Sequence, residues 1–108
     1  MSGDSSVVVI GLSGELDVGR ADEVARSLAL SGSGTPVLLD LSDVSYADST
    51  VISALFHFSE KATAANVRIA VLMVKPQLIR LLEYAGLSEA FPVFRERSAA
   101  LTYLLNNG

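Results

Sequence analysis

The residues with the clearest capacity for chemistry are Asp48, Ser49 and Thr50, a carboxylate followed by two hydroxyls. They follow an apolar segment and open a stretch with helical spacing, so we expect them at a helix N-terminus. A side-chain oxygen there can cap the helix by accepting a hydrogen bond from a free backbone N–H. The free N–H groups and partial positive charge of such an N-terminus also tolerate a phosphate. The residues alone leave both interpretations open, a helix cap or a phosphorylation site.

A second polar group, Gly14-Glu15-Leu16-Asp17, follows the first apolar segment of the chain. It can form a turn with a helix cap, or an acidic surface that faces a partner. In a parallel α/β sheet, the segments that follow strands gather at one edge. We therefore expect Glu15 and Asp17 to lie near Asp48, on one acidic surface that also carries hydroxyl groups.

Patterns typical of catalytic or metal-binding sites do not occur in this sequence. His57 is the only histidine and there is no cysteine, which argues against a metal centre, a disulfide framework and thiol chemistry. Neither GxGxxG nor GxxxxGK[ST] is found, so no glycine-rich phosphate loop is expected. No nucleophile and general base can be paired. We expect a protein that is not an enzyme and that uses no cofactor and no metal.

The composition is that of a globular domain with a substantial core. The chain has 108 residues, of which 50% are hydrophobic and 19% charged, and its net charge is −4. This length suits one compact domain. The negative charge argues against nucleic acids and anionic membrane surfaces as partners. No apolar run approaches the roughly 18 residues of a membrane span, and no signal peptide is apparent, so we predict a cytoplasmic location without membrane insertion.

Apolar runs alternate with helical spacings along the chain. The runs that predict strands cover residues 7–12, 37–41, 67–74 and 91–94. The spacings that predict helices cover residues 20–30, 49–65, a segment from Pro76 to Gly86, and a last helix that contains Leu101, Leu104 and Leu105. The alternation predicts an α/β fold with a mixed, mostly parallel sheet of about four strands and four helices on its two faces. We place this single domain at residues 7–106, after an N-terminal tail of residues 1–6.

Three motifs, in this order and spacing, resemble those of STAS-domain proteins, and in particular the small bacterial anti-sigma-factor antagonists. The family's G-E-[LI]-D segment between the first strand and helix has a counterpart in SGELDVGRADEV. Its central motif, an aliphatic strand followed by D-S-[ST], has a counterpart in LLDLSDVSYADST. Its third helix, with the ending R-L-[LF]-x-x-x-G-L, has a counterpart in KPQLIRLLEYAGLSEAF. The resemblance spans nearly the whole chain and implies the STAS fold.

The resemblance also implies a function in partner switching. The unmodified antagonist binds an anti-sigma factor that is also a serine kinase, and this frees a sigma factor. The kinase uses ATP to phosphorylate the serine directly after the motif aspartate, and a metal-dependent serine phosphatase resets the protein. That serine is Ser49 here, with Thr50 as the secondary candidate. We expect the partner-binding surface to comprise Glu15, Asp17, Asp48, Ser49, Thr50 and Val51.

Two departures from the family pattern bear on these expectations. Val51 stands where the family usually has glycine, and we expect its branched side chain at the surface that a kinase would grip. Only six residues precede Val7, so we expect the family's extra N-terminal strand to be shortened or missing. The sheet edge left in this way could pair in a weak homodimer.

An alternative function comes from a different class of STAS protein. The chain would then be a regulatory subunit of a membrane transport complex, such as a lipid-transport ABC system, and no phosphorylation would be required. A third class, a sensor of small ligands, requires a pocket, which a sequence cannot reveal.

Overall fold

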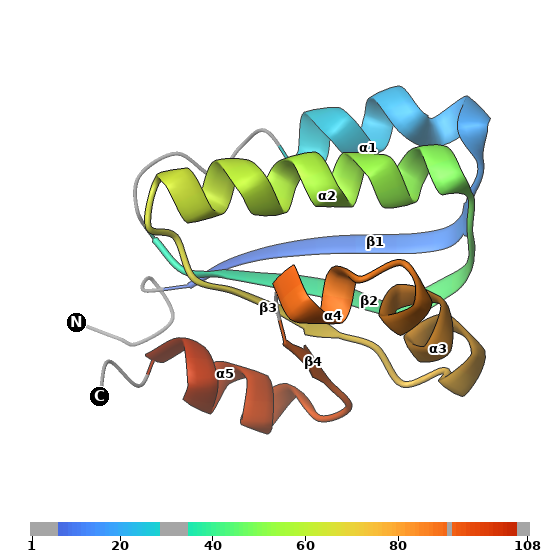
Figure 1. Cartoon of the computed structure of the whole chain (residues 1–108). Coiled ribbons are helices and arrows are strands. Elements are labelled where there is room, and N and C mark those ends of the chain that lie inside the picture. Colours follow the sequence, from blue (N-terminus) through green and yellow to red (C-terminus); the bar gives the residue numbers. More distant parts are fainter. Residues whose placement is uncertain (1–6, 29–34, 91, 106–108) are drawn as a thin grey trace.

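The computed structural model describes residues 7–28, 35–90 and 92–105, which form one sheet between two layers of helices (Figure 1). Along the chain the elements are β1 (Val8–Leu16), the 3-10 turn η2 (Val18–Arg20), α1 (Ala21–Leu28), β2 (Val37–Ala47), α2 (Ser49–Ala64), β3 (Ile69–Leu72), α3 (Pro76–Tyr84), α4 (Leu87–Ala90), β4 (Val93–Phe94) and α5 (Arg97–Leu105). Within these ranges no helix has both the length and the apolar character that a membrane span requires.

The sheet has the strand order β1-β2-β3-β4, and each neighbouring pair is parallel. The predicted fold class is therefore confirmed, with the refinement that all four strands of the described sheet are parallel. The four predicted helices are present as α1, α2, α3 and α5, and α4 is an additional single turn that the sequence reading did not separate from α3. The predicted tail of residues 1–6 and the end of the predicted domain, residue 106, lie outside the described residues.

Two apolar cores hold the layers together, one on each face of the sheet. The larger core lies under α1 and α2, which run side by side over one face (Figure 1). Its members come from the sheet and from α1 to α4, and include Ile10, Leu12, Leu39, Leu55, Phe58 and Leu82. The smaller core lies under α5 and consists of Leu38, Ala70, Leu72, Ala100 and Leu104. Burial of strand residues on both faces explains why the central strands are continuous apolar runs.

Capping residues set several of the helix boundaries. Pro76 occupies the first turn of α3, where its missing N–H costs nothing. Gly86 follows α3 with φ +83°, a conformation that favours glycine. α1 begins one residue later than the predicted helix 20–30, because η2 takes up Arg20. Residues 29 and 30, the end of that prediction, lie outside the described residues.

β2 continues, together with β1, well beyond the end of β3. Its first residues, Val37 to Asp40, pair with both β1 and β3, whereas residues 41–47 pair with β1 alone. The predicted strand 37–41 was therefore too short. The continuation has only one buried face, with Leu41 and Val44 in the larger core and polar residues between them, so it lacks the continuous apolar run used for prediction. The result is a two-stranded ribbon that ends at the acidic residues.

A two-stranded ribbon is marginally stable on its own and needs a packed face. Here α3 supplies part of that face: Leu78, Leu81 and Leu82 line a void of only about 10 Å³ together with Leu41 and Val44 of the ribbon. This close packing makes α3 the support on which the ribbon lies.

We expect Leu82→Ala to lower the free energy of unfolding by about 2–5 kcal/mol, because Leu82 is buried and its loss enlarges this void. Urea denaturation measures the change. The matched control is Arg80→Ala on the same helix, an exposed site where the change should stay within about 0.5 kcal/mol. Equal effects of the two substitutions would contradict the supporting role of α3.

Candidate functional site

The two acidic segments meet at the carboxyl ends of β1 and β2. Leu16 pairs with Ala47, and the Asp48 N–H donates a hydrogen bond to the Leu16 carbonyl oxygen at 3.0 Å. Asp17 and Asp48 therefore follow directly on paired residues of adjacent strands. The expectation that these segments share one edge of the sheet is confirmed, although Glu15 belongs to β1 itself and not to a turn.

Asp48 is the cap of α2. Its Oδ1 accepts a hydrogen bond from the Thr50 N–H at 2.7 Å, and its backbone carbonyl accepts one from the Ile52 N–H at 3.0 Å. Ser49 and Thr50 are exposed in the first turn, and neither hydroxyl hydrogen-bonds to another described residue. The two interpretations of this triplet are thus compatible, because the carboxylate caps the helix and the hydroxyls are left for other chemistry.

The expectation that Val51 presents its side chain at the surface is wrong. Val51 has 0% exposure and belongs to the larger core, where it borders the same small void as Leu16, Val44 and Leu78. The third helical residue points inward because the cap places Ser49 and Thr50 on the outside of the turn. Val51 therefore anchors this turn to the core, and a partner that docks on the folded domain meets Ser49 and Thr50 instead.

Two β-bulges in β2 bring Asp48 to its position. Between the pairs Gly11–Asp40 and Ser13–Asp43, β2 has one residue more than β1, and the same occurs between Gly14–Val44 and Glu15–Tyr46. Bulges increase local twist and re-aim the side chains that follow.

The first bulge is held by hydrogen bonds around Ser42. The Ser42 N–H and hydroxyl both donate to Asp40 Oδ1, at 3.0 and 2.6 Å. Lys75, the residue before α3, donates from Nζ to the Ser42 carbonyl oxygen at 2.9 Å. These bonds tie the bulge to the N-terminus of α3, so the ribbon is fixed by polar as well as apolar contacts.

Arg20 organises the end of β1. Its Nη1 donates to the carbonyl oxygens of Ser13 at 2.6 Å and Glu15 at 3.3 Å, and its guanidinium forms a bidentate pair with Glu23. The hydrogen bond from Arg20 lowers the pKa of the Glu23 carboxyl, and in turn raises the pKa of Arg20. Because β1 is an edge strand, Arg20 supplies hydrogen bonds that a further strand would otherwise supply.

Gly14 fits this arrangement for two reasons. Its φ of +80° lies in the left-handed region, and a Cβ atom there would stand 3.3 Å from Arg20 Nη1. Asp17 then accepts a hydrogen bond from the Gly19 N–H at 3.1 Å and so caps η2. The predicted capping role of this segment is therefore present, and the carboxylate of Glu15 is left exposed beside it.

Two exposed apolar side chains at this edge were not among the predicted site residues. Val18 is 66% exposed in η2, and Tyr46, opposite Glu15 on the ribbon, is 50% exposed. Exposed aromatic side chains such as Tyr46 are enriched at the centres of protein interfaces, and an exposed Val18 adds apolar surface beside it. The signal for both lay in the sequence, as isolated apolar residues inside the polar stretches that follow the strands.

Metal-binding potential is low over the part of the chain that the structure describes. No group of three or more His, Cys, Asp or Glu side chains could hold an ion there. His57 is exposed on α2, with Nδ1 at 3.7 Å from Glu60 Oε1, away from the acidic edge. The acidic edge thus offers carboxylates, hydroxyls and apolar side chains to a partner.

We expect Asp48→Ala to lower the free energy of unfolding by about 1 kcal/mol, since it removes the only side-chain cap of α2. Ser49→Ala should leave stability within about 0.5 kcal/mol, because the Ser49 hydroxyl makes no hydrogen bond that the fold uses. Paired urea denaturation curves of the two variants test this assignment. A larger loss for Ser49→Ala than for Asp48→Ala would show that the serine is the cap.

Solved structures of other proteins share this architecture, whereas comparison with curated proteins gives no match. Among solved structures, an anti-sigma factor antagonist from Mycobacterium paratuberculosis has a TM-score of 0.83 and 26% identity, covering 94% of this chain and 87% of the other. A sulfate transporter family protein from Wolinella succinogenes has a TM-score of 0.71 and 26% identity, with coverage of 92% and 84%.

A third structure, of a proposed anti-sigma factor antagonist from Thermotoga maritima, shares the fold with a TM-score of 0.82 at 19% identity, over 94% of this chain and 89% of the other. The family model described as "STAS domain" matches residues 1–100. The motifs, the parallel sheet and this match lead to one conclusion: the chain belongs to the STAS domain family.

Proposed function

We propose that this protein is an anti-sigma-factor antagonist whose binding to an anti-sigma factor is switched off by phosphorylation of Ser49. One observation carries the proposal: Asp48 alone caps α2, so the Ser49 hydroxyl is exposed and free of hydrogen bonds to other described residues. A kinase can therefore reach the hydroxyl without unfolding the helix. The similarity to the antagonist from Mycobacterium paratuberculosis supports the proposed class of partner.

The local electrostatics suit a switch that acts directly at an interface. A phosphate at the first position of α2 would gain from the helix N-terminus, so the fold would tolerate it. It would add a charge of about −1.5 to −2 beside Asp48 and close to Asp17. A partner complementary to the unmodified acidic edge would then meet more charge and more volume. A tenfold loss of affinity needs only about 1.4 kcal/mol.

In this proposal the domain is a substrate and a binding partner, and it performs no catalysis. The kinase supplies ATP and Mg²⁺, and a serine phosphatase removes the phosphate, so the domain needs no cofactor. Glu15, Asp17, Asp48, Ser49 and Thr50 form the partner surface, with Val18 and Tyr46 added to it. We place the protein in the cytoplasm, where sigma factors act, with no nucleic acid as direct partner.

The weak homodimer remains a prediction about the outer edge of β1. Arg20 already hydrogen-bonds the Ser13 and Glu15 carbonyls, so a second copy could pair only with the earlier part of that strand. A strictly monomeric mass in light scattering at high concentration would contradict it.

We expect the partner kinase to phosphorylate the wild-type chain and Thr50→Ala but not Ser49→Ala. Ser49 directly follows Asp48, the capping residue. The backbone N–H of Thr50, by contrast, is held by its hydrogen bond to Asp48 Oδ1. Phosphate incorporation, with the modified residue located by mass spectrometry, measures the outcome. Full incorporation into Ser49→Ala, with the label on Thr50, would show that the acceptor is misassigned.

We expect wild-type protein to capture a serine-kinase anti-sigma factor from native cell lysate, and Ser49→Asp to lose it. The added carboxylate imitates part of the phosphate charge in the place where the partner docks. Bound proteins are identified by mass spectrometry, and Ser53→Asp, an exposed site one turn along α2, is the charge-matched control. Capture by both wild type and Ser49→Asp would contradict the switch.

A transport role is the second candidate, favoured by the similarity to the sulfate transporter family protein from Wolinella succinogenes. The chain would then be a regulatory subunit of a membrane transport complex, of the lipid-type ABC class, and the Asp48 cap would serve α2 alone. The same capture experiment separates the two: transporter subunits bound equally by wild type and Ser49→Asp would favour this role.

A further inference from the structure

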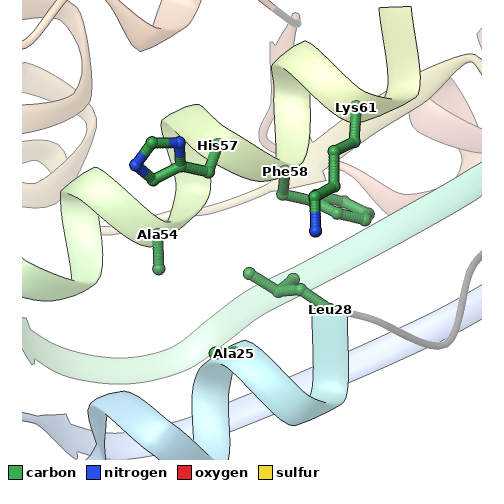
Figure 2. Close-up of a pocket in the computed structure, with 6 residues that line it drawn as sticks. All are labelled: Ala25, Leu28, Ala54, His57, Phe58 and Lys61. Atoms are coloured by element: carbon green, nitrogen blue, oxygen red, sulfur yellow. The ribbon is translucent and has the colours of Figure 1, made fainter. Parts of the chain in front are cut away.

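A groove runs between α1 and α2 on the outer face of the helical layer, away from the first turn of α2. Its volume is about 380 Å³, at the lower end of the range for small-molecule sites. Figure 2 shows Ala54 and Lys61 projecting from α2 toward α1, where Ala25 and Leu28 face them. Phe58 and His57 complete its lining.

Small residues leave this space open between the two helices. Ala25 and Ala54 occupy the places at which larger side chains would close the helix–helix contact. Leu28 and Phe58, each 4% exposed, form the apolar floor, and they belong to the larger core that fixes them in place. The groove is therefore a shaped, apolar surface with a rigid base.

The rim of the groove carries nitrogen groups and no carboxylate among its lining residues. Lys61 is exposed and forms no salt bridge with any described residue, in a chain whose net charge is −4. His57 stands one turn before it, 3.7 Å from the exposed Glu60 carboxylate, which does not line this groove and instead lines a separate hollow with Phe56 and Thr63. The Lys61 ammonium is thus available to an anion whose apolar part lies between Ala25 and Ala54, above Leu28 and Phe58.

We propose that this groove binds a small amphipathic carboxylate, with its hydrocarbon part on the apolar floor and its single charge paired with Lys61. A monoanion fits better than a phosphate, because one ammonium and one imidazole are the only polar side chains that line the groove. The proposal is independent of the function proposed for Ser49, because the groove lies beyond the first turn of α2. It applies to this chain whether the chain is an anti-sigma-factor antagonist or a subunit of a transport complex.

Octanoate is a suitable probe, since it combines one carboxylate with a short alkyl chain. Titrated into ¹⁵N-labelled protein, it should shift the amide resonances of Ala25, Leu28, Ala54 and Lys61 in a saturable manner, with a dissociation constant of about 1 mM or tighter. Octylammonium, with the same chain and the opposite charge, should not produce these shifts.

Two variants separate the apolar and the charged parts of the site. Ala25→Leu should abolish the shifts, because the larger side chain fills the groove at an exposed helical position that tolerates leucine. Lys61→Gln should weaken binding by about fivefold. Arg80→Gln, the loss of an exposed cation on α3, is the matched control and should leave binding unchanged.

Four results would overturn the proposal. They are the absence of saturable shifts, shifts centred away from α1 and α2, equal binding of octylammonium, or unchanged binding in Ala25→Leu. A circular dichroism spectrum that stays constant through the titration excludes the remaining explanation, partial unfolding by the amphiphile. If octanoate binds as expected but Ser49 proves not to control partner binding, only the proposed function is contradicted. If Ser49 controls partner binding but octanoate does not bind, only this inference is contradicted.

Discussion

The structure depends on how the β1–β2 ribbon is supported after β3 has ended. Two strands alone cannot bury enough surface to be stable, so the free part of the ribbon has to be packed against helices on its apolar face. α2 and α3 provide this packing, and the Lys75–Ser42 hydrogen bond adds a polar tie to the N-terminus of α3. Everything at the acidic edge rests on this arrangement, because Asp17 and Asp48 lie where the ribbon ends.

Much of the fold could be predicted because hydrophobic periodicity reports which faces are buried. The central strands are buried on both faces and the helices on one, so both produced clear patterns. The second half of β2 did not, since Leu41, Val44 and Ala47 are spaced by bulges and alternate with exposed polar residues. A bulge breaks the period of two on which strand prediction depends. The short α4 was also missed, because one helical turn contains too few residues to show a period.

The site was predicted in position but not in detail. Sequence reasoning placed Glu15, Asp17 and Asp48 on one edge, as the topology of parallel strands requires. It left the Asp48-Ser49-Thr50 alternatives open, because only the three-dimensional geometry assigns the hydrogen bond of the cap to one oxygen. It also misjudged Val51. A side chain in the first turn of a helix can point toward the core or toward solvent, and its direction depends on the position and orientation in which the preceding strand ends. The α1–α2 groove left no recognisable signal, since alanine is common on any helix.

The two bulges have a consequence for how this protein can change over evolutionary time. Each extra residue in β2 shifts all later side chains by one place relative to β1. After the first bulge alone, the later side chains would face the wrong side of the sheet, and the second bulge restores them to the correct side. Loss or gain of one codon between Asp40 and Asp48 would therefore turn Val44 or Ala47 toward solvent and redirect the cap of α2. Substitutions in this stretch can accumulate at its exposed positions, whereas its length is constrained. Related chains that preserve this edge should conserve the number of residues between these two aspartates more strictly than the identity of the residues themselves.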